Sequence, residues 1–135
     1  MKILLDTNAY SALRRNHETV SKLVQESGEV LLSTVVAGEL LYGFRNGSRY
    51  EANIRVLQEF LEDPNVRLLP VTWETADLFG RISADLRRKG RPIPTNDIWI
   101  AAHAQEAGAE LISSDPHFGY IDGLSWQAFA TPESG

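Results

Sequence analysis

The sequence predicts an α/β domain of three layers, α/β/α, in which helices cover both faces of a central, mostly parallel sheet of four to five strands. Short apolar runs alternate along the chain with longer segments whose apolar residues recur at helical spacing. Strands separated by helices pair in parallel, because the connecting helix carries the chain back to the same end of the sheet. With 135 residues the chain has room for one hydrophobic core, so we expect residues 1–135 to form a single domain with a loose tail at 131–135.

The N-terminal half is expected to contain three strands and three helices. An apolar run predicts the first strand, and Val20, Leu23 and Val24 share one face of the helix that follows. Thr34 is the expected N-cap of a helix that stops at an Asn-Gly pair, and Tyr50 begins another run of apolar residues at helical spacing. In order we expect a strand at 3–5, a helix ending near 28, a strand at 30–33, helices at 34–47 and 50–63, and a strand at 66–69.

The C-terminal half is expected to add two helices and one or two strands. Phe79, Ile82 and Leu86 form the apolar face of a helix that ends at Gly90, a residue type that readily closes helices. A proline-rich loop separates this helix from the next one. In order we expect a helix ending at 90, a loop at 91–94, a helix from 95 to near 108, a strand at 111–112 and a fifth strand within 124–129.

The composition excludes several classes of protein. The absence of cysteine rules out disulfides, thiolate metal sites and a cysteine nucleophile. No apolar stretch approaches the roughly 20 residues of a membrane span, and an acid interrupts the first apolar run too early for a signal peptide. We therefore expect a cytoplasmic protein with no membrane partner. The net charge of −5 by itself argues against nucleic-acid binding, because phosphate contacts come from Lys and Arg.

Three acids lie where the predicted strands and helices meet one edge of the sheet. Asp6 directly follows the first strand, Asp115 follows the strand at 111–112 after two serines, and Asp97 opens the helix after the proline-rich loop. Ligands of open parallel sheets bind beyond the carboxyl ends of the strands, so these side chains are expected to converge. The alternative for each acid taken alone is a helix cap that complements the helix dipole.

Glu39 is a fourth candidate, because it lies on an apolar helix face. Its neighbours at helical spacing include Val35, Val36 and Tyr42. A carboxylate there needs a partner, since burial of an unpaired charge costs several kcal/mol or more. The alternatives are an ion pair with Arg45 or a side chain that extends to solvent.

Converging carboxylates without cationic neighbours predict a hard divalent cation. Carboxylates and water suit Mg²⁺ or Mn²⁺. Zinc is disfavoured, because cysteine is absent and His17, His103 and His117 do not fall into a metal-ligand spacing. A divalent cation can polarise a phosphoryl oxygen and activate water, so phosphodiester hydrolysis is the expected chemistry. Without the four acids the net charge would be −1, which weakens the objection to a nucleic-acid substrate.

Four motifs carry a resemblance to PIN-domain nucleases, and it spans nearly the whole chain. They are residues 5–8 (LDTN), 36–40 (VAGEL), 94–104 (PTNDIWIAAHA) and 111–118 (LISSDPHF). The length and the motifs are most similar to VapC-type toxins of bacterial type II toxin–antitoxin pairs.

The resemblance implies a metal-dependent endoribonuclease that leaves a 3′-hydroxyl and a 5′-phosphate. It assigns the catalytic metal site to Asp6, Glu39, Asp97 and Asp115. It assigns supporting roles to Thr7, Asn8 and Ser114. It also implies one or two Mg²⁺ or Mn²⁺ ions, an RNA substrate, a homodimer, and a cognate antitoxin whose tail blocks the acidic site.

Basic and aromatic side chains are candidates for contact with RNA. Arg87 and Arg88 belong to a basic cluster near a predicted helix end, and phosphate binding there competes with the alternative of a solvated helix C-terminus. The other members of the cluster are Arg81, Lys89 and Arg91. His117 follows Asp115 closely enough to touch substrate, whereas His103 is expected to be structural. The three tryptophans could stack on bases, but packing roles are the stronger expectation.

Two other functions remain as alternatives. One is a phosphatase in which Asp6 acts as the nucleophile, although such enzymes usually carry a second acid two residues later, where this chain has Asn8. A phosphorylated receiver domain fits less well, because it would need an adjacent acid pair near the first strand and a lysine partner, and the chain offers neither clearly. The other alternative is a binding module whose acids hold a cation without catalysis.

Overall fold

A computed structural model describes residues 1–131, and within them the chain forms one parallel sheet of five strands in the order β3-β2-β1-β4-β5. All four strand pairings are parallel, as strands connected through helices require. The strands are β1 (Lys2–Leu5), β2 (Glu29–Ser33), β3 (Val66–Leu69), β4 (Glu110–Ile112) and β5 (Trp126–Gln127). The predicted fold class is confirmed, and the fifth strand lies within the expected segment.

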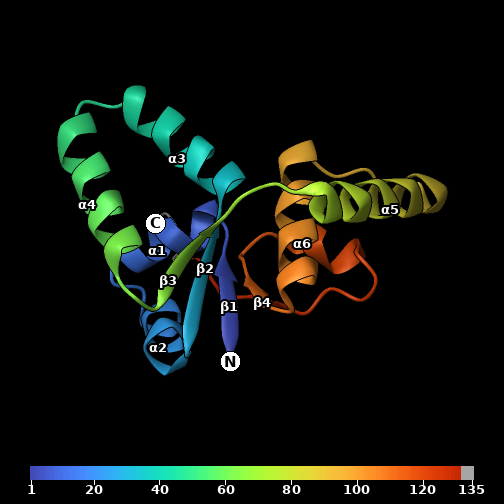
Figure 1. Ribbon diagram of the computed structural model, residues 1–135, viewed down its shortest axis with the longest axis horizontal. Helices are drawn as coiled ribbons and strands as arrows, with labels where there is room; N and C mark the ends of the chain where they lie inside the picture. The colour runs from blue at the N-terminus through green and yellow to red at the C-terminus, as the bar shows by residue number, and fades with distance from the viewer. Residues whose placement is uncertain (132–135) are drawn as a thin grey trace.

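Helices flank the sheet on both sides (Figure 1). They are α1 (Thr7–Arg14), α2 (Glu18–Glu26), α3 (Thr34–Arg45), α4 (Tyr50–Glu62), α5 (Trp73–Lys89) and α6 (Thr95–Ala107), with a 3₁₀ helix η1 (Pro116–Tyr120). In Figure 1 α3 and α4 extend to the left of the strands, while α5 and α6 pack together on the right. Among residues 1–131 no helix is both long and apolar enough to cross a membrane.

The central strand β1 is buried along its apolar run. Ile3, Leu4 and Leu5 have no exposed surface, because neighbouring strands pair with both edges of β1 and helices cover its faces. Such complete burial explains why β1 reads as an unbroken apolar run rather than as an alternating one. The strand therefore delivers the residue that follows it, Asp6, to the carboxyl edge of the sheet.

Two local features differ from the sequence expectation. Helix α1 was not predicted, because its eight residues form a short, largely polar segment in which only Ala9, Tyr10 and Ala12 are buried. The predicted N-cap Thr34 is wrong by one residue: the hydroxyl of Ser33 accepts a hydrogen bond from the Val35 N–H at 3.0 Å. The expected loose tail falls mainly on residues 132–135, which lie outside the described part of the chain.

Candidate active site

The four predicted acids converge at the carboxyl edge of the sheet. Asp6 caps α1 directly after β1, and Asp115 caps η1 shortly after β4. Asp97 lies in the first turn of α6, and Glu39 lies in the middle of α3. Their charges influence one another: Glu39 and Asp115 both raise the pKa values of Asp6 and Asp97. Four segments far apart in the sequence thus contribute to one acidic site.

Asp6 forms the buried part of this site. Its residue surface is 5% exposed, and Oδ1 accepts a hydrogen bond from the Ala9 N–H at 2.8 Å while Oδ2 accepts one from the Ser113 hydroxyl. Burial raises the pKa of Asp6 to about 6, against the two hydrogen bonds, which lower it. The nearby charges of Asp115 and Glu39 raise it further. Two hydrogen bonds and its position as the N-cap of α1 therefore hold Asp6 in a buried place where ionisation is unfavourable.

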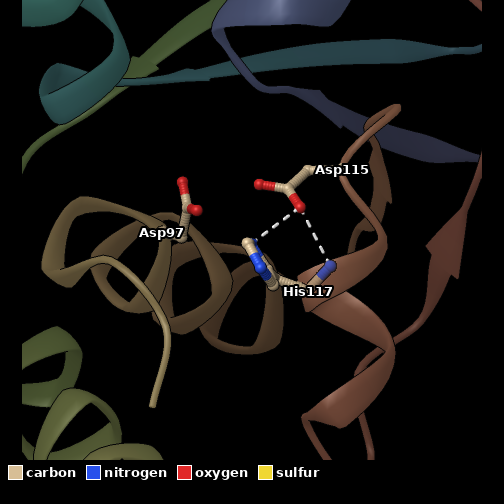
Figure 2. Close-up of side chains that lie close together, drawn as sticks. All are labelled: Asp97, Asp115 and His117. Atoms are coloured by element: carbon tan, nitrogen blue, oxygen red, sulfur yellow. Dashed lines mark hydrogen bonds and ion pairs between the residues drawn. The ribbon is translucent and has the colours of Figure 1, made fainter. Parts of the chain in front are cut away.

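Asp97 and Asp115 are partly exposed, and their side chains lie near each other in Figure 2. The pKa of Asp97 is raised to about 7, first by burial and then by the charge of Asp115 and a hydrogen bond with it. Glu39 and Asp6 contribute further in the same direction. Without a cation, this crowding keeps Asp97 partly protonated near neutral pH.

Glu39 is held by polar side chains rather than by an arginine. Its Oε1 accepts a hydrogen bond from the Thr7 hydroxyl at 2.6 Å, and its Oε2 accepts one from Asn96 Nδ2 at 3.3 Å. Arg45 instead donates to the Tyr50 hydroxyl at 2.9 Å and stacks over the same ring. The alternative of a Glu39–Arg45 ion pair is therefore wrong, and the negative charge of Glu39 remains available to the site.

Ser113 is the serine that hydrogen-bonds to the acids, and the supporting role of Ser114 stays a prediction. Its hydroxyl donates to Asp6 and accepts a hydrogen bond from the Asp115 N–H at 3.0 Å, so it links two of the four acids. Ser114 makes no side-chain hydrogen bond within the described residues, and Asn8 is exposed. Sequence reasoning missed Ser113 and Asn96, because both act across elements. The signal for Ser113 lies in the register: Leu5 pairs with Ile112, so Asp6 and Ser113 come next to each other.

His117 lies beside the acids and contacts Asp115, while its contact with substrate stays a prediction. Its Nδ1 is 3.0 Å from Asp115 Oδ1, and its backbone N–H donates to the same oxygen at 2.9 Å (Figure 2). One donor atom from each of Asp97, Asp115 and His117 lies within 4.8 Å of the others. His103 has the structural role expected for it, because its buried ring bonds to the Ser33 hydroxyl and the Pro70 carbonyl.

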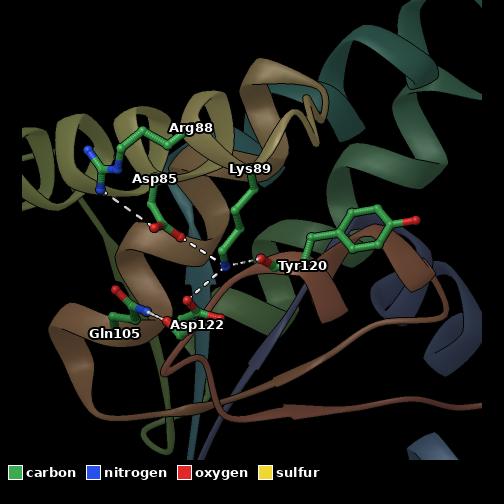
Figure 3. A network of polar contacts seen from close by, with 6 residues as sticks. All are labelled: Asp85, Arg88, Lys89, Gln105, Tyr120 and Asp122. Atoms are coloured by element: carbon green, nitrogen blue, oxygen red, sulfur yellow. Dashed lines mark hydrogen bonds and ion pairs between the residues drawn. The ribbon is translucent and has the colours of Figure 1, made fainter.

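Most of the basic cluster is engaged in local ion pairs. Arg81 pairs with Asp77 at 2.8 Å, and Arg88 lies 3.5 Å from Asp85. Lys89 bridges Asp85 and Asp122 and donates to the Tyr120 carbonyl (Figure 3). Arg91 lies over the Tyr120 ring, 5.1 Å from its centre. Arg87 is exposed and makes no ion pair within residues 1–131, so RNA contact by Arg87 and Arg88 stays a prediction.

The tryptophans have different environments. Trp99 stacks on Phe79 with ring centres 4.0 Å apart, and Trp126 donates from its indole N–H to the Ser113 carbonyl at 3.1 Å. Packing therefore accounts for both of them. Trp73, at the start of α5, is 83% exposed.

The donor chemistry fits a divalent cation. Four carboxylates share the site, and within residues 1–131 none of them pairs with a Lys or Arg; Thr7, Asn96 and Ser113 donate hydrogen bonds to Glu39 and Asp6. Burial first, and then mutual repulsion among the acids, raise the pKa values of Asp6 and Asp97, and a bound cation would relieve the repulsion. An oxygen-rich set of this kind suits Mg²⁺ or Mn²⁺.

Comparisons with known proteins identify the family of this chain. The PIN domain family model matches residues 3–124. Ribonuclease VapC2 from Haemophilus influenzae is 37% identical over 117 residues, which cover 85% of this chain and 87% of that protein. The chain therefore belongs to the PIN-domain family, and the resemblance carried by the four motifs is confirmed.

Solved structures share the fold over almost the full length. VapBC2 from Rickettsia felis, bound to a DNA fragment from its promoter, has a TM-score of 0.85 at 24% identity and covers 96% of this chain and 100% of its own. VapBC-1 from nontypeable Haemophilus influenzae has a TM-score of 0.84 at 30% identity, with coverage of 95% and 98%.

Proposed function

We propose that this protein is a metal-dependent endoribonuclease and the toxin component of a type II toxin–antitoxin pair. The observation that carries the proposal is the convergence of four carboxylates from four segments at one edge of the sheet. The relative named as a ribonuclease supports the activity, and the VapBC complexes support an antitoxin partner. A homodimer stays a prediction.

Asp6, Glu39, Asp97 and Asp115 are the residues that would hold one or two Mg²⁺ or Mn²⁺ ions. Such an ion polarises a phosphoryl oxygen and makes water acidic enough to supply a nucleophile near neutral pH. The protein's part is to hold the carboxylates in a set arrangement before substrate arrives.

Burial and hydrogen bonding separate the four acids into two groups. Asp6 is fixed by Ala9 and Ser113, and Glu39 is fixed by Thr7 and Asn96. Asp6 is buried, whereas Asp97 and Asp115 are partly exposed, so Asp6 lies at the floor of the site and the other two border its open side. The phosphodiester therefore approaches past Asp97 and Asp115.

The phosphatase alternative fits this arrangement poorly. A nucleophilic Asp6 would need a free, accessible oxygen, yet the residue is buried and each of its oxygens accepts a hydrogen bond. The position of the second acid is occupied by Asn8, whose amide cannot act as a general acid. Turnover of a simple aryl phosphate by the pure protein would reverse this preference.

Cleavage of RNA by the purified protein tests the proposed activity. We expect cleavage only with Mg²⁺ or Mn²⁺, with products that carry a 5′-phosphate and a 3′-hydroxyl. Asp97→Asn should lower the rate at least about 100-fold, because the amide cannot supply the charge that the ion needs. Asp85→Asn is the matched control, since this acid lies on α5 and pairs with Lys89. Cleavage that persists in excess chelator would contradict metal dependence.

A further inference from the structure

We propose that His117 Nδ1 is a ligand of the cation and makes the site prefer Mn²⁺ to Mg²⁺. The proposal rests on the proposed function for the presence of a cation, and it adds a nitrogen donor to the carboxylate set. His117 belongs to η1, whereas Asp97 belongs to α6. The three side chains of this subsite, Asp97, Asp115 and His117, face one another in Figure 2.

The donor separations match those of ligands on one ion. Adjacent ligands of an octahedral ion with bonds near 2.1 Å are about 3 Å apart, and opposite ligands are about 4.2 Å apart. His117 Nδ1 and Asp115 Oδ1 are 3.0 Å apart, the spacing of adjacent ligands. One donor from each of the three residues lies within 4.8 Å of the others, close to the separation of about 4.2 Å between opposite ligands.

The local backbone holds this pair in place before any ion binds. Asp115 Oδ1 accepts a hydrogen bond from the His117 N–H at 2.9 Å, and the Asp115 N–H donates to Ser113 at 3.0 Å. Pro116, between the two residues, restricts its own φ angle and starts η1. The capping turn therefore folds the imidazole back over the carboxylate, so little rotamer freedom is lost when the two side chains bind an ion.

The identity of the added donor determines which ion is favoured. Carboxylate oxygens and water suit Mg²⁺, whereas imidazole nitrogen suits later divalent ions, and Mn²⁺ accepts both kinds of donor. Removing the imidazole should therefore weaken Mn²⁺ binding much more than Mg²⁺ binding. The competing explanation of the 3.0 Å contact is a protonated imidazole paired with Asp115. An imidazolium would repel any cation, so its removal would strengthen the binding of both ions.

Metal titration of the full-length protein tests the proposal without reference to catalysis. Mn²⁺ and Mg²⁺ affinities are measured by calorimetry for the wild type, His117→Ala and Asp97→Asn. We expect His117→Ala to weaken Mn²⁺ binding about tenfold or more and Mg²⁺ binding less than about threefold. His17→Ala is the matched control, because that ring bonds to the Ala130 carbonyl at 2.7 Å. Asp97→Asn should weaken both ions.

Pulsed electron paramagnetic resonance of bound Mn²⁺ gives a second readout. A coupling to imidazole ¹⁴N should appear in the wild type and in His17→Ala, and it should be lost in His117→Ala. Equal weakening of both ions with no nitrogen coupling would overturn the ligand role and leave His117 as a residue that positions Asp115. Stronger binding of both ions by His117→Ala would overturn it in favour of the ion pair. Failure of the wild type to bind either ion would overturn the cation site itself, and with it the proposed function.

Discussion

At the scale of single residues, the site is governed by how each carboxylate is satisfied. Asp6 and Glu39 each accept two hydrogen bonds from fixed donors, so their orientation is set by the fold. Asp97 lies close to Asp115 instead. Its pKa is raised first by burial and then by the charge of Asp115 and the hydrogen bond with it. The protein also holds Asp115, whose Oδ1 accepts a hydrogen bond from the His117 N–H at 2.9 Å, so Asp97 is the acid of the four that would gain most from a bound cation.

Substitution of Ser113 tests the support of the buried acid. Ser113→Ala removes a donor from Asp6 and an acceptor from the Asp115 N–H. We expect it to lower the free energy of unfolding by about 1–3 kcal/mol, because a buried carboxylate oxygen loses its partner. Metal affinity should also fall, since Asp6 is no longer fixed. Urea unfolding and Mg²⁺ titration measure the two effects.

Ser114→Ala is the control for this substitution. Ser114 is the adjacent serine and makes no side-chain hydrogen bond within residues 1–131, so its loss should change stability by less than about 0.5 kcal/mol. The assignment of the supporting role to Ser113 fails if Ser114→Ala is the more damaging of the two.

At the scale of elements, several helices and strands meet the site through their ends. Asp6 is both an acid of the site and the N-cap of α1, and Asp115 has the same double role at η1. The segment that follows Asp115 is tied to α5 by Lys89, which bonds to Asp122 at 2.7 Å and to the Tyr120 carbonyl at 3.1 Å. Gln105 of α6 donates to the Asp122 carbonyl at 3.2 Å (Figure 3). These contacts keep η1, and with it His117, beside the site.

Removal of the Lys89 tether should loosen η1. In Lys89→Met we expect faster hydrogen exchange at the Phe118 and Ile121 amides, because Lys89 joins their segment to α5. The increase in exchange rate should stay below about tenfold, since exposed ion pairs contribute little to stability. Hydrogen exchange read by mass spectrometry or NMR measures it.

Arg88→Met serves as the comparison, because Arg88 contacts Asp85 within α5 and not the η1 segment. Exchange in residues 116–122 should be unchanged in this variant. Equal acceleration in both variants would mean that α5 itself, and not the tether, was disturbed.

At the scale of the whole molecule, the raised pKa of Asp97 makes the acidic site a cost to folding at neutral pH, which a bound cation would relieve. The pKa of Asp97 is raised from 3.8 to about 7 in the folded protein, so the unfolded chain ionises Asp97 at a lower pH than the folded one does. The folded state therefore loses stability relative to the unfolded state as pH rises from about 4, and the loss is complete above about pH 7. Solvent screening reduces the size of this stability loss, because Asp97 is only partly buried.

Asp97→Asn should relieve this strain in the metal-free protein. We expect the variant to gain on the order of 1 kcal/mol over wild type at pH 7.5 and to show no gain near pH 4, where Asp97 is protonated in the folded state. Added Mg²⁺ or Mn²⁺ should stabilise the wild type more than the variant, because the ion binds the native site. Chemical unfolding at both pH values, with chelator and with metal, measures the differences.

Asp85→Asn provides a control of opposite sign. A hydrogen bond with Lys89 lowers the pKa of Asp85, so this carboxylate favours the folded state at neutral pH and its loss should not stabilise the protein. If Asp97→Asn is less stable than the wild type in chelator at pH 7.5, then the interaction of the Asp97 carboxylate with the N-terminus of α6 outweighs its repulsion by the other acids.

The sequence by itself determined the features that depend on neighbours along the chain. The apolar run of β1, the glycines that close α5 and α6, and the four acidic motifs are local patterns, so the α/β class and the four acids could be predicted from them. Helix α1 could not be predicted, because it is short and largely polar. Its one clear sequence signal is the N-cap Asp6, which also fits an acid of the site.

Only the tertiary structure decided which side chains surround the acids. Ser113 meets Asp6 because β1 and β4 pair in one register, and Asn96 meets Glu39 because α6 packs near α3. His117 meets Asp115 through a capping turn whose geometry a spacing rule for metal ligands does not describe. Strand register and helix packing are set by the burial of the whole core rather than by any one segment, so residues distant in sequence acquire their partners only when the chain has folded.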